Sequence, residues 1–286
     1  MRLLRWSSAF RRSGREDRLK AELQREPDSK GLIVDLTPGD SVNGHANGAA
    51  ISPGLYRSNG SVPAFEVKFL VTEAEAVQIE ERLRSRLAPD PHADNNGAYR
   101  VTSVYFDTPA WDVYHRSDKH RRRKYRVRRY GTSPTVFLER KSKKEQRVRK
   151  RRTALPLAEL TGLSGEGPSD WPGAWFARQV TARGLRPVCR VSYRRVALVG
   201  TCPDGPIRVT FDRTAHGGPA NGPTPECVVD GHALLHTEVI VEFKFLASMP
   251  VLFKDVIDGL RLGPRPVSKY RRCVEAVGLA TEGRNA

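Results

Sequence analysis

The sequence predicts an α+β protein built on an antiparallel β-sheet or β-barrel of about eight strands, with helices packed outside. Three observations predict this class. Eight or nine segments alternate apolar and charged residues at the two-residue period of a strand. No βαβ rhythm links these segments, which argues against a parallel sheet. No stretch of about 18 apolar residues occurs, so the sequence predicts no membrane-spanning helix.

The two ends of the chain differ from its middle. Residues 1–60 are predicted to form a flexible, disordered basic arm, because Gly-containing turn pairs recur there and aromatic residues are few. The arginines of this arm, with Trp6 and Phe10, could touch an anionic membrane surface, although a solvated tail is the simpler interpretation. We expect one ordered domain over 61–280 and a short tail over 281–286.

The cellular compartment is predicted from the N-terminus and the cysteines. The arginine-rich start lacks the apolar stretch of about 7–15 residues that a secretory signal requires. The four cysteines form no CxxC pair and no zinc-ribbon spacing. They are typical of unpaired thiols in the cytoplasm, where we expect the protein to act.

The ordered domain is predicted to begin with a strand over 65–71, FEVKFLV, in which apolar and charged residues alternate. Thr72 and Glu75 then form the T-x-x-E pattern of a capping box. A helix of about four turns should follow, with Leu87 on its apolar face and Pro89 ending it.

The rest of the domain is predicted as strands joined by loops and a few helices. The strands are expected over 99–107, 124–130, 136–141, 146–156, 188–198, 207–211 and 237–245. The helices are expected over 108–115, 175–183, 251–262 and 268–277. A long loop rich in Gly, Ser and Pro is expected over 161–173.

The chain is strongly basic. Its 286 residues carry 49 Lys and Arg against 32 Asp and Glu, a formal net charge of +17. Between Arg116 and Arg152 there are 18 Lys and Arg and 3 acidic residues. Such a charge predicts a polyanionic partner: nucleic acid, an anionic membrane, or phosphate-rich small molecules.

The charged residues of the predicted strands lie two apart, so they share one face of each strand. A solvated outer face would explain any single strand. Three strands, however, carry the same E-x-K motif, and if the sheet closes these side chains meet in one basic cavity. Arginine suits phosphate oxygens, and carboxylates beside phosphates suit Mg²⁺ or Mn²⁺. The motif pairs are Glu66 and Lys68, Glu139 and Lys141, and Glu242 and Lys244.

Taken in order, the segments that carry this pattern resemble a known family. They are FEVKF (65–69), VTSVYFDTPAWDVYHR (101–116), KYRVRRYG (124–131), FLERK (137–141), VRKRRTALP (148–156), VSYRR (191–195), IRVTFD (207–212), VEFKF (241–245) and VSKYRR (267–272). From about Phe65 to Val277 the chain resembles the VTC domain, the polyphosphate-polymerase domain of the triphosphate tunnel metalloenzyme superfamily.

The resemblance implies a tunnel of antiparallel strands that transfers the γ-phosphoryl group of ATP onto a growing polyphosphate chain. It implies Mn²⁺ or Mg²⁺ as cofactor, with Glu242 as the metal-binding glutamate, and ATP and inorganic polyphosphate as partners. The catalytic, phosphate-contacting residues carried over from the family are Lys68, Arg126, Arg128, Lys141, Arg195, Arg208, Lys244 and Lys269. The further substrate-binding candidates are Arg116, whose spacing to Arg126 differs from the family pattern, Ser268, Glu66 and Glu139.

Two features depart from the wider superfamily. Ala64 replaces the first glutamate of its E-x-E-x-K signature, as expected of a VTC-type member. The eukaryotic relatives add an SPX sensor domain and membrane helices, and the sequence shows neither. Regulation by inositol phosphates and coupled membrane translocation are therefore not carried over from those relatives.

Three other functions remain open from the sequence. The same tunnel could hydrolyse triphosphate or short polyphosphate with water, or it could bind polyphosphate without turnover. A nucleic-acid-binding protein is a further alternative, but no sequence-specific nucleic-acid motif occurs and the basic residues follow strand spacing. The sequence does not predict an oligomeric state.

Weaker signals receive structural interpretations. Asp107 is predicted to cap a helix or turn, and Asp212 to end its strand at a turn. His232 and His236 could share a helical face, but no third metal ligand lies nearby in the sequence. The basic run over 143–152 is predicted to be mostly a solvated hairpin, with some residues at the tunnel mouth. Trp111, Trp171 and Trp175 are predicted to pack in the core.

Overall fold

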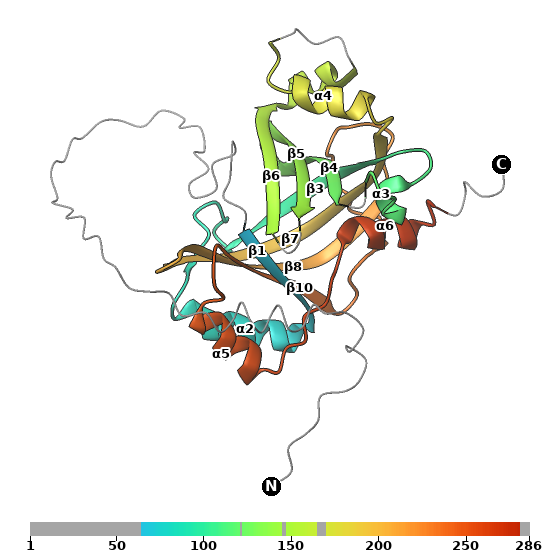
Figure 1. The fold of residues 1–286 in the computed structure, drawn as a ribbon. Coiled ribbons are helices and arrows are strands. Elements are labelled where there is room, and N and C mark those ends of the chain that lie inside the picture. Colours follow the sequence, from blue (N-terminus) through green and yellow to red (C-terminus); the bar gives the residue numbers. More distant parts are fainter. Residues whose placement is uncertain (1–63, 121, 145–146, 165–169, 281–286) are drawn as a thin grey trace, which may run out of the picture. The chain divides into compact units, whose positions relative to one another are not determined.

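The ordered domain is a closed antiparallel barrel. The computed structural model describes residues 64–120, 122–144, 147–164 and 170–280, so the predicted arm over 1–60 and tail over 281–286 lie outside the described residues (Figure 1). The strands are β1 (Ala64–Thr72), β2 (Ala88–Pro89), β3 (Ala98–Asp107), β4 (Arg123–Tyr130), β5 (Thr135–Lys144), β6 (Arg147–Pro156), β7 (Arg186–Cys202), β8 (Gly205–Pro219), β9 (His232–Ala233) and β10 (Glu238–Phe245).

Eight of these strands form the ring. Neighbours pair in the order β7-β3-β4-β5-β6-β1-β10-β8, and β7 also pairs with β8, which closes the barrel. Every pair is antiparallel. The short strands β2 and β9 extend the sheet beyond the ring. The predicted fold class is therefore confirmed, and closure leaves the ring with no free edge.

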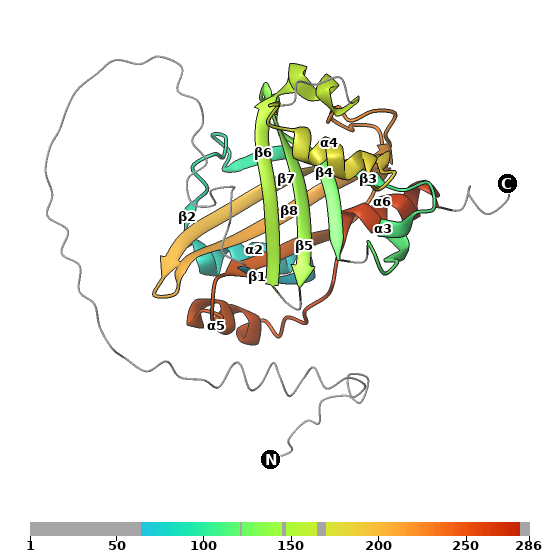
Figure 2. The ribbon, with the colours of Figure 1, turned by 45° about the horizontal axis from the view of Figure 1, so that its top comes forward.

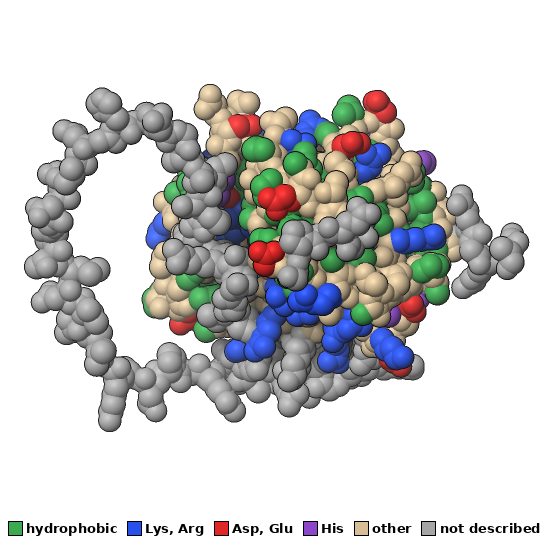
Figure 3. Space-filling view, turned by 90° about the horizontal axis from the view of Figure 1, so that it is seen from above, with side chains coloured by type: hydrophobic (Ala, Val, Ile, Leu, Met, Phe, Trp, Pro, Cys, Tyr) green, Lys and Arg blue, Asp and Glu red, His purple; other side chains and the backbone are tan. Residues whose placement is uncertain are grey.

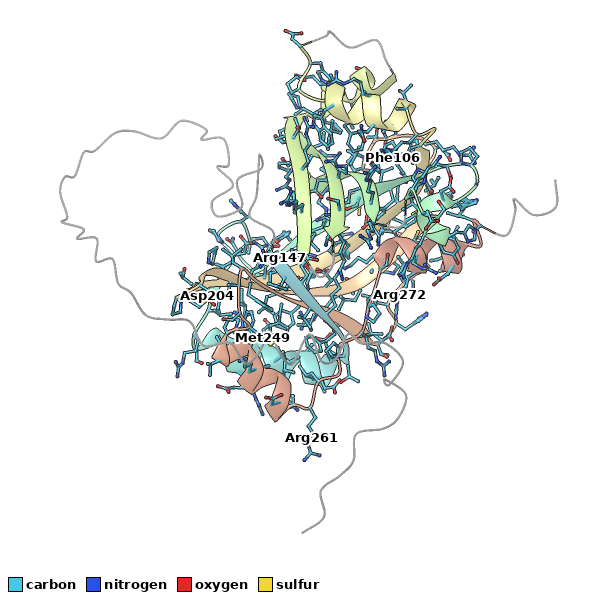
Figure 4. All side chains as sticks on the ribbon, in the orientation of Figure 1. Phe106, Arg147, Asp204, Met249, Arg261 and Arg272 are labelled. Carbon is cyan, nitrogen blue, oxygen red and sulfur yellow. The ribbon has the colours of Figure 1, made fainter. Side chains whose placement is uncertain are left out.

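Helices cover the outside of the barrel. They are α2 (Glu73–Arg84), α3 (Asp112–His115), the 3₁₀ helix η2 (Leu157–Ser164), α4 (Ala174–Thr181), α5 (Val251–Gly259) and α6 (Lys269–Val277). Helices α2 and α5 lie together below β1 and β10, whereas α4 lies at one end of β4, β5 and β6 (Figures 1 and 2). Helix α6 is tied to β10 by Arg272, labelled in Figure 4, which donates to Glu238 at 2.7 Å.

Helix α2 is held at its start by the predicted capping box. The Thr72 hydroxyl accepts from the Glu75 N–H at 3.2 Å, and the Glu75 carboxylate accepts from the Thr72 N–H at 2.8 Å. The helix ends at Arg84, before Pro89, because Ala88 and Pro89 pair with β7 as β2. Leu87 therefore lies beyond the helix, although it is still buried.

The hydrophobic core lies between the barrel and its helices. Phe69 on β1 and Phe243 on β10 are fully buried on the outer face, with ring centroids 5.4 Å apart. Phe253 of α5 packs on Phe243 at 4.7 Å, and Ile79 of α2 belongs to the same cluster. A second cluster lies against β3, β4 and β5 and contains all three tryptophans named above. Because the apolar faces point outward under the helices, the charged faces must point into the ring.

Several boundaries differ from the predictions. Strands β7 and β8 form a ribbon longer than predicted, since their pairing continues to Gly205 at the turn and to Pro219 at the far end. Part of the predicted loop over 161–173 belongs to η2. His232 lies in β9, so the helical face expected for His232 and His236 is wrong. None of the described helices has the length and hydrophobicity that a membrane span requires.

Candidate functional site

A basic space of about 90 Å³ lies inside the barrel. Strand alternation directs every second side chain into this space, and the start of α6 closes part of its wall. Nine of the thirteen predicted site residues line it. The lining residues are Lys68, Tyr105, Lys124, Arg126, Arg128, Lys141, Tyr193, Arg195, Glu242, Lys244, Val267, Ser268 and Lys269.

The first part of the wall is a network of three lysines and two glutamates from β1, β5 and β10. Glu242 accepts from Lys68 at 2.8 Å and from Lys244 at 2.9 Å. Glu66 accepts from Lys141 at 2.5 Å and lies 3.6 Å from the Lys244 Nζ atom. Burial alone would raise the pKa of Glu242, but the lysine charges hold it well below its usual range. Burial and the charge of Glu242 would raise the pKa of Glu66, but the three lysines lower it below its ordinary value. Both glutamates are therefore ionised, and the lysines outnumber them.

The second part of the wall is centred on Asp212. Arg195 holds this carboxylate with two parallel hydrogen bonds of 2.6 and 2.7 Å, and Lys269 of α6 donates to it at 2.5 Å. The prediction that Asp212 ends its strand at a turn is wrong, because β8 continues to Pro219. Although burial raises the pKa of Asp212, the charges of Arg195 and Lys269 lower it further than burial raises it.

The third part of the wall is centred on Glu139 of β5. Its carboxylate lies 2.6 Å from Arg126, 3.1 Å from Arg152 and 3.7 Å from Lys150. Burial would raise the pKa of Glu139, but these cations hold it well below its ordinary value. These contacts show that Lys150 and Arg152 point into the barrel. The other cations of the basic run over 143–152 whose side chains are described are exposed, so the prediction that this run is mostly solvated is confirmed.

Alternate residues of the same run point outward. Arg147, Arg149 and Arg151 are exposed on the outer face of β6. Arg147 lies beside Phe65 of β1 (Figure 4). Seen from above, Lys and Arg side chains gather along one edge of the described surface (Figure 3).

Two interior cations have no carboxylate partner among the described residues. Lys124 donates to the Ser268 hydroxyl at 2.8 Å. Arg128 is buried and donates to the Ser103 hydroxyl at 3.0 Å and to the Tyr193 hydroxyl at 3.1 Å. Burial, and then the charges of nearby lysines and arginines, lower the pKa of Lys124 well below its usual value. These two side chains are the wall groups least compensated by the protein itself.

Four lining residues were not predicted from the sequence as site residues: Tyr105, Lys124, Tyr193 and Val267. Lys124 lies two positions before Arg126, so continuing the strand alternation would have found it. Tyr193 lies two positions before Arg195 in the same way, and its ring supports Lys269 at 4.4 Å.

Four predicted site residues do not line the space. Arg208 faces Asp90 and the Tyr99 hydroxyl. Arg116 is exposed at the end of α3, but its charge contributes to lowering the pKa of Lys124. The other two are the paired carboxylates Glu66 and Glu139, which set the charge of the wall through the cations they bind.

Asp107 has the capping role that the sequence predicts. Its carboxylate accepts from the backbone N–H groups of Thr108, Val113 and Tyr114. The Tyr270 hydroxyl also donates to it, which joins α3 to α6. Asp107 is therefore a structural residue beside the site.

A divalent cation would have to share this wall with phosphate. In the described part of the chain no three metal-ligating side chains come together. Glu66 and Glu242 lie close enough to share Lys244. The negative charge of Glu242 acts to raise the pKa of Glu66, which also shows that the two carboxylates are neighbours. One or two carboxylates are what Mg²⁺ commonly takes from a protein when substrate phosphates and water complete its shell. This donor set fits such a cation.

Comparison with known proteins gives a family match and distant structural likenesses. The family described as the VTC domain matches residues 64–277. A search of curated proteins finds no match. A putative adenylate cyclase from Bacillus halodurans is similar in structure, with a TM-score of 0.45 and 12% identity over 71% of this chain and 92% of its own.

Two other solved structures show a similarly low structural likeness to this chain. One is the putative adenylyl cyclase HpAC1 from Hippeastrum, whose description reports a dominant triphosphatase activity. It has a TM-score of 0.41 and 14% identity over 78% of this chain and 97% of its own. The other, PH1819 from Pyrococcus horikoshii, has a TM-score of 0.38 and 16% identity over 77% of this chain and 99% of its own.

Proposed function

Because this chain belongs to the VTC domain family, we propose that it is a polyphosphate polymerase that transfers the γ-phosphoryl group of ATP onto a growing polyphosphate chain. The reaction would occur inside the barrel, in the cytoplasm. Transfer between two phosphates needs mainly positioning and charge stabilisation, because the transition state is loose and the acceptor is already an anion.

One observation carries this proposal: cations from five strands and one helix meet in one interior space and exceed the carboxylates that compensate them. A wall with such an excess repels itself and is costly to bury without an anion. A chain of phosphates supplies that anion at regular intervals. The lining cations are Lys68, Lys124, Arg126, Arg128, Lys141, Arg195, Lys244 and Lys269, and the carboxylates that they contact are Glu66, Glu139, Asp212 and Glu242.

Each part of the wall has a role in the proposed reaction. Arg128 and Lys124 would bind phosphate oxygens without first leaving a carboxylate. Thr210 adds a buried hydroxyl with no hydrogen-bond partner among the described residues, and strand alternation places it on the same face as Asp212. Lys244 would move from the two glutamates onto phosphate as substrate enters.

The glutamates freed in this way would hold the divalent cation. Glu242 is the proposed ligand, with Glu66 beside it. These residues would hold Mn²⁺ or Mg²⁺, and the bound cation would supply positive charge to offset the charge that develops on the phosphates. Meanwhile, the guanidinium groups of Arg126 and Arg195 stay fixed by Glu139 and Asp212, so they can hold the transferring group in one orientation.

A product assay tests the proposal. Purified protein incubated with ATP and Mn²⁺ should form long polyphosphate, seen on a gel with a phosphate-binding dye, together with ADP. Arg128→Ala and Lys244→Ala should each reduce turnover by about 100-fold or more, because each removes a preorganised cation at the reacting phosphates. Glu242→Gln should lose the dependence of rate on Mn²⁺ concentration.

Arg149→Ala is the matched control, since Arg149 is exposed on the outer face of β6. It should keep full activity. Free phosphate without chains would instead identify a hydrolase, and polyphosphate binding without ATP turnover would identify a binding module. Full activity of both tunnel variants would overturn the assignment of the reaction to the barrel interior.

A further inference from the structure

A second, larger cleft lies on the outer surface of the barrel. It has a volume of about 350 Å³ and is lined by residues of β3, β7 and β8 and by Val228 and Val229 of the following loop. Its volume is within the range of sites that hold small molecules. Tyr193 lines both this cleft and the interior space, so the two cavities are neighbours separated by strand β7.

Arginines dominate the floor of the cleft. Arg100 of β3 and Arg194 of β7 are register partners and both are exposed. Like charges directly opposite each other destabilise a pair of strands. Arg213, the partner of Arg194 on β8, is compensated by Glu73 at 2.8 Å, whereas neither Arg100 nor Arg194 has a carboxylate partner among the described residues.

The one carboxylate among the described residues that line the cleft, Asp94, offsets only one of the two guanidinium charges, so the cleft stays net positive. His216 of β8 lines the same space, so an imidazole faces it beside the two guanidinium groups. The Asp94 carboxylate is oriented by the backbone N–H groups of Asn96 and Ala98, from which it accepts at 2.9 and 3.0 Å. Among the described residues, the Arg100 side chain donates to the Cys227 sulfur at 3.0 Å.

The wall of the cleft is held in place without a ligand. The Val228 N–H donates to the Ser192 hydroxyl at 2.8 Å, and Ser192 is hydrogen-bonded to Thr102 at 2.9 Å. An ion pair between Arg190 and Glu226 at 3.0 Å also fixes this loop, just before Val228 in the sequence. A preformed site loses less ordering entropy on binding than one that must close around its ligand.

We propose that this cleft is a second anion site that binds a small phosphorylated molecule through Arg100, Arg194 and His216. Two guanidinium groups and an imidazole, contributed by three strands, suit a tetrahedral phosphate that accepts from several directions. Val228 and Val229 offer an apolar surface to the organic part of such a molecule. The site is separate from the interior space and does not depend on the proposed polymerase activity.

Calorimetric titration with pyrophosphate, in metal-free buffer at constant ionic strength, tests the proposal. The wild-type protein should bind at two sites. Arg194→Glu should lose one of them, with at least a ten-fold weaker affinity there. Its unfolding midpoint in urea should stay the same or rise, because the new carboxylate lies between Arg100 and Arg213.

Three comparisons separate the cleft from the interior. Arg128→Ala should lose the other site and keep the cleft site. Arg149→Glu, an equal charge change on the outer face of β6, should keep both. Acetate at the same ionic strength should not displace pyrophosphate from the cleft. Unchanged binding by Arg194→Glu, or loss of all binding in Arg128→Ala, would overturn the second site, and the latter result would leave the interior site standing.

Discussion

Each carboxylate of the interior wall is shared by at least two cations, and this sharing lets so many charges be buried together. Asp212 serves Arg195 and Lys269, and Glu242 serves Lys68 and Lys244. Removing one member of such a buried group leaves an uncompensated charge, which costs about 3–5 kcal/mol. An interior cation without a carboxylate partner lowers the stability of the fold, and a bound anion can offset this cost.

Lys124 is the residue where this cost can be measured. It has no carboxylate partner among the described residues, and its pKa is lowered by burial and by neighbouring cations, so its charged form disfavours the folded state at neutral pH. Lys124→Met should therefore raise the free energy of unfolding by about 1 kcal/mol, measured in urea. It should also weaken tripolyphosphate binding by at least ten-fold, measured by calorimetry.

The control is Lys119→Met, at an exposed position, which should change neither quantity beyond about 0.5 kcal/mol. Lys124→Arg should keep binding and show no gain in stability. A destabilised Lys124→Met protein would mean that the lysine stem, rather than its charge, contributes most at this position.

At the scale of elements, strand alternation made the interior face predictable. Lys68, Arg126 and Lys141 were assigned to one face from the two-residue period alone, and the structure places them on one wall. The extent of β8 was not predictable in this way, because it depends on pairing with β7 far along the chain. Asp212 was misassigned for that reason: its sequence neighbours suggest a turn, whereas its spatial neighbours are Arg195 and Lys269.

The same limit applies to Lys124. Its position in the alternation is visible in the sequence. That no described carboxylate pairs with it, however, depends on which strands flank it after closure. Neighbouring β5 sets Lys141 opposite Lys124 and Glu139 opposite Arg126, so one lysine faces another cation while Arg126 gains its carboxylate. The sequence pattern shows on which face of a strand a residue lies. Its charged neighbours can be known only from the register in which the strands pair.

Helix α2 offers a test of whether the stability of the fold can be lowered without a loss of activity in the barrel interior. Thr72→Ala removes the side-chain acceptor of the capping box and should lower the free energy of unfolding by about 1 kcal/mol in urea. Turnover of ATP should stay within two-fold of the wild type, because the helix packs on the outer face of β1 and β10.

Thr72→Ser keeps a hydroxyl acceptor at the same position and should retain nearly all of the stability. A large loss of turnover in Thr72→Ala under conditions where the protein remains folded would show that the position of β1 depends on the helix cap. In that case the interior wall would be less rigid than its ion-pair networks indicate.

At the scale of the whole molecule, the barrel reverses the usual distribution of polarity. Its apolar core lies between the strands and the outer helices, and a cluster of charged side chains lies within the ring. The pKa of interior lysines responds to this arrangement. The pKa of Lys269 is lowered to about 8, mainly because the side chain is buried. The charge of Asp212 raises this pKa, whereas the charges of Arg195 and Lys68 lower it further. Burial likewise lowers the pKa of Lys150 to about 8.

The sign of the resulting pH dependence follows from these shifts. A lysine with a lowered pKa loses its charge as pH rises through about 8, whereas a bound phosphate favours the charged form. Tripolyphosphate binding should therefore take up protons between about pH 8 and pH 10 and should weaken over this range. In the free protein the same groups act oppositely: their cost to folding is largest below pH 8 and disappears as pH rises toward the ordinary lysine pKa.

Titration with tripolyphosphate in metal-free buffer at constant ionic strength measures this effect. Affinity at pH 9.5 should be about ten-fold lower than at pH 7, which is the loss of one charge-assisted contact of about 1.5 kcal/mol. At pH 8.5, heats in buffers of different ionisation enthalpy should report proton uptake. Lys269→Arg keeps its charge throughout this range and should flatten the profile. Identical profiles for the wild type and Lys269→Arg, with no proton uptake, would place the binding of phosphate outside the barrel interior.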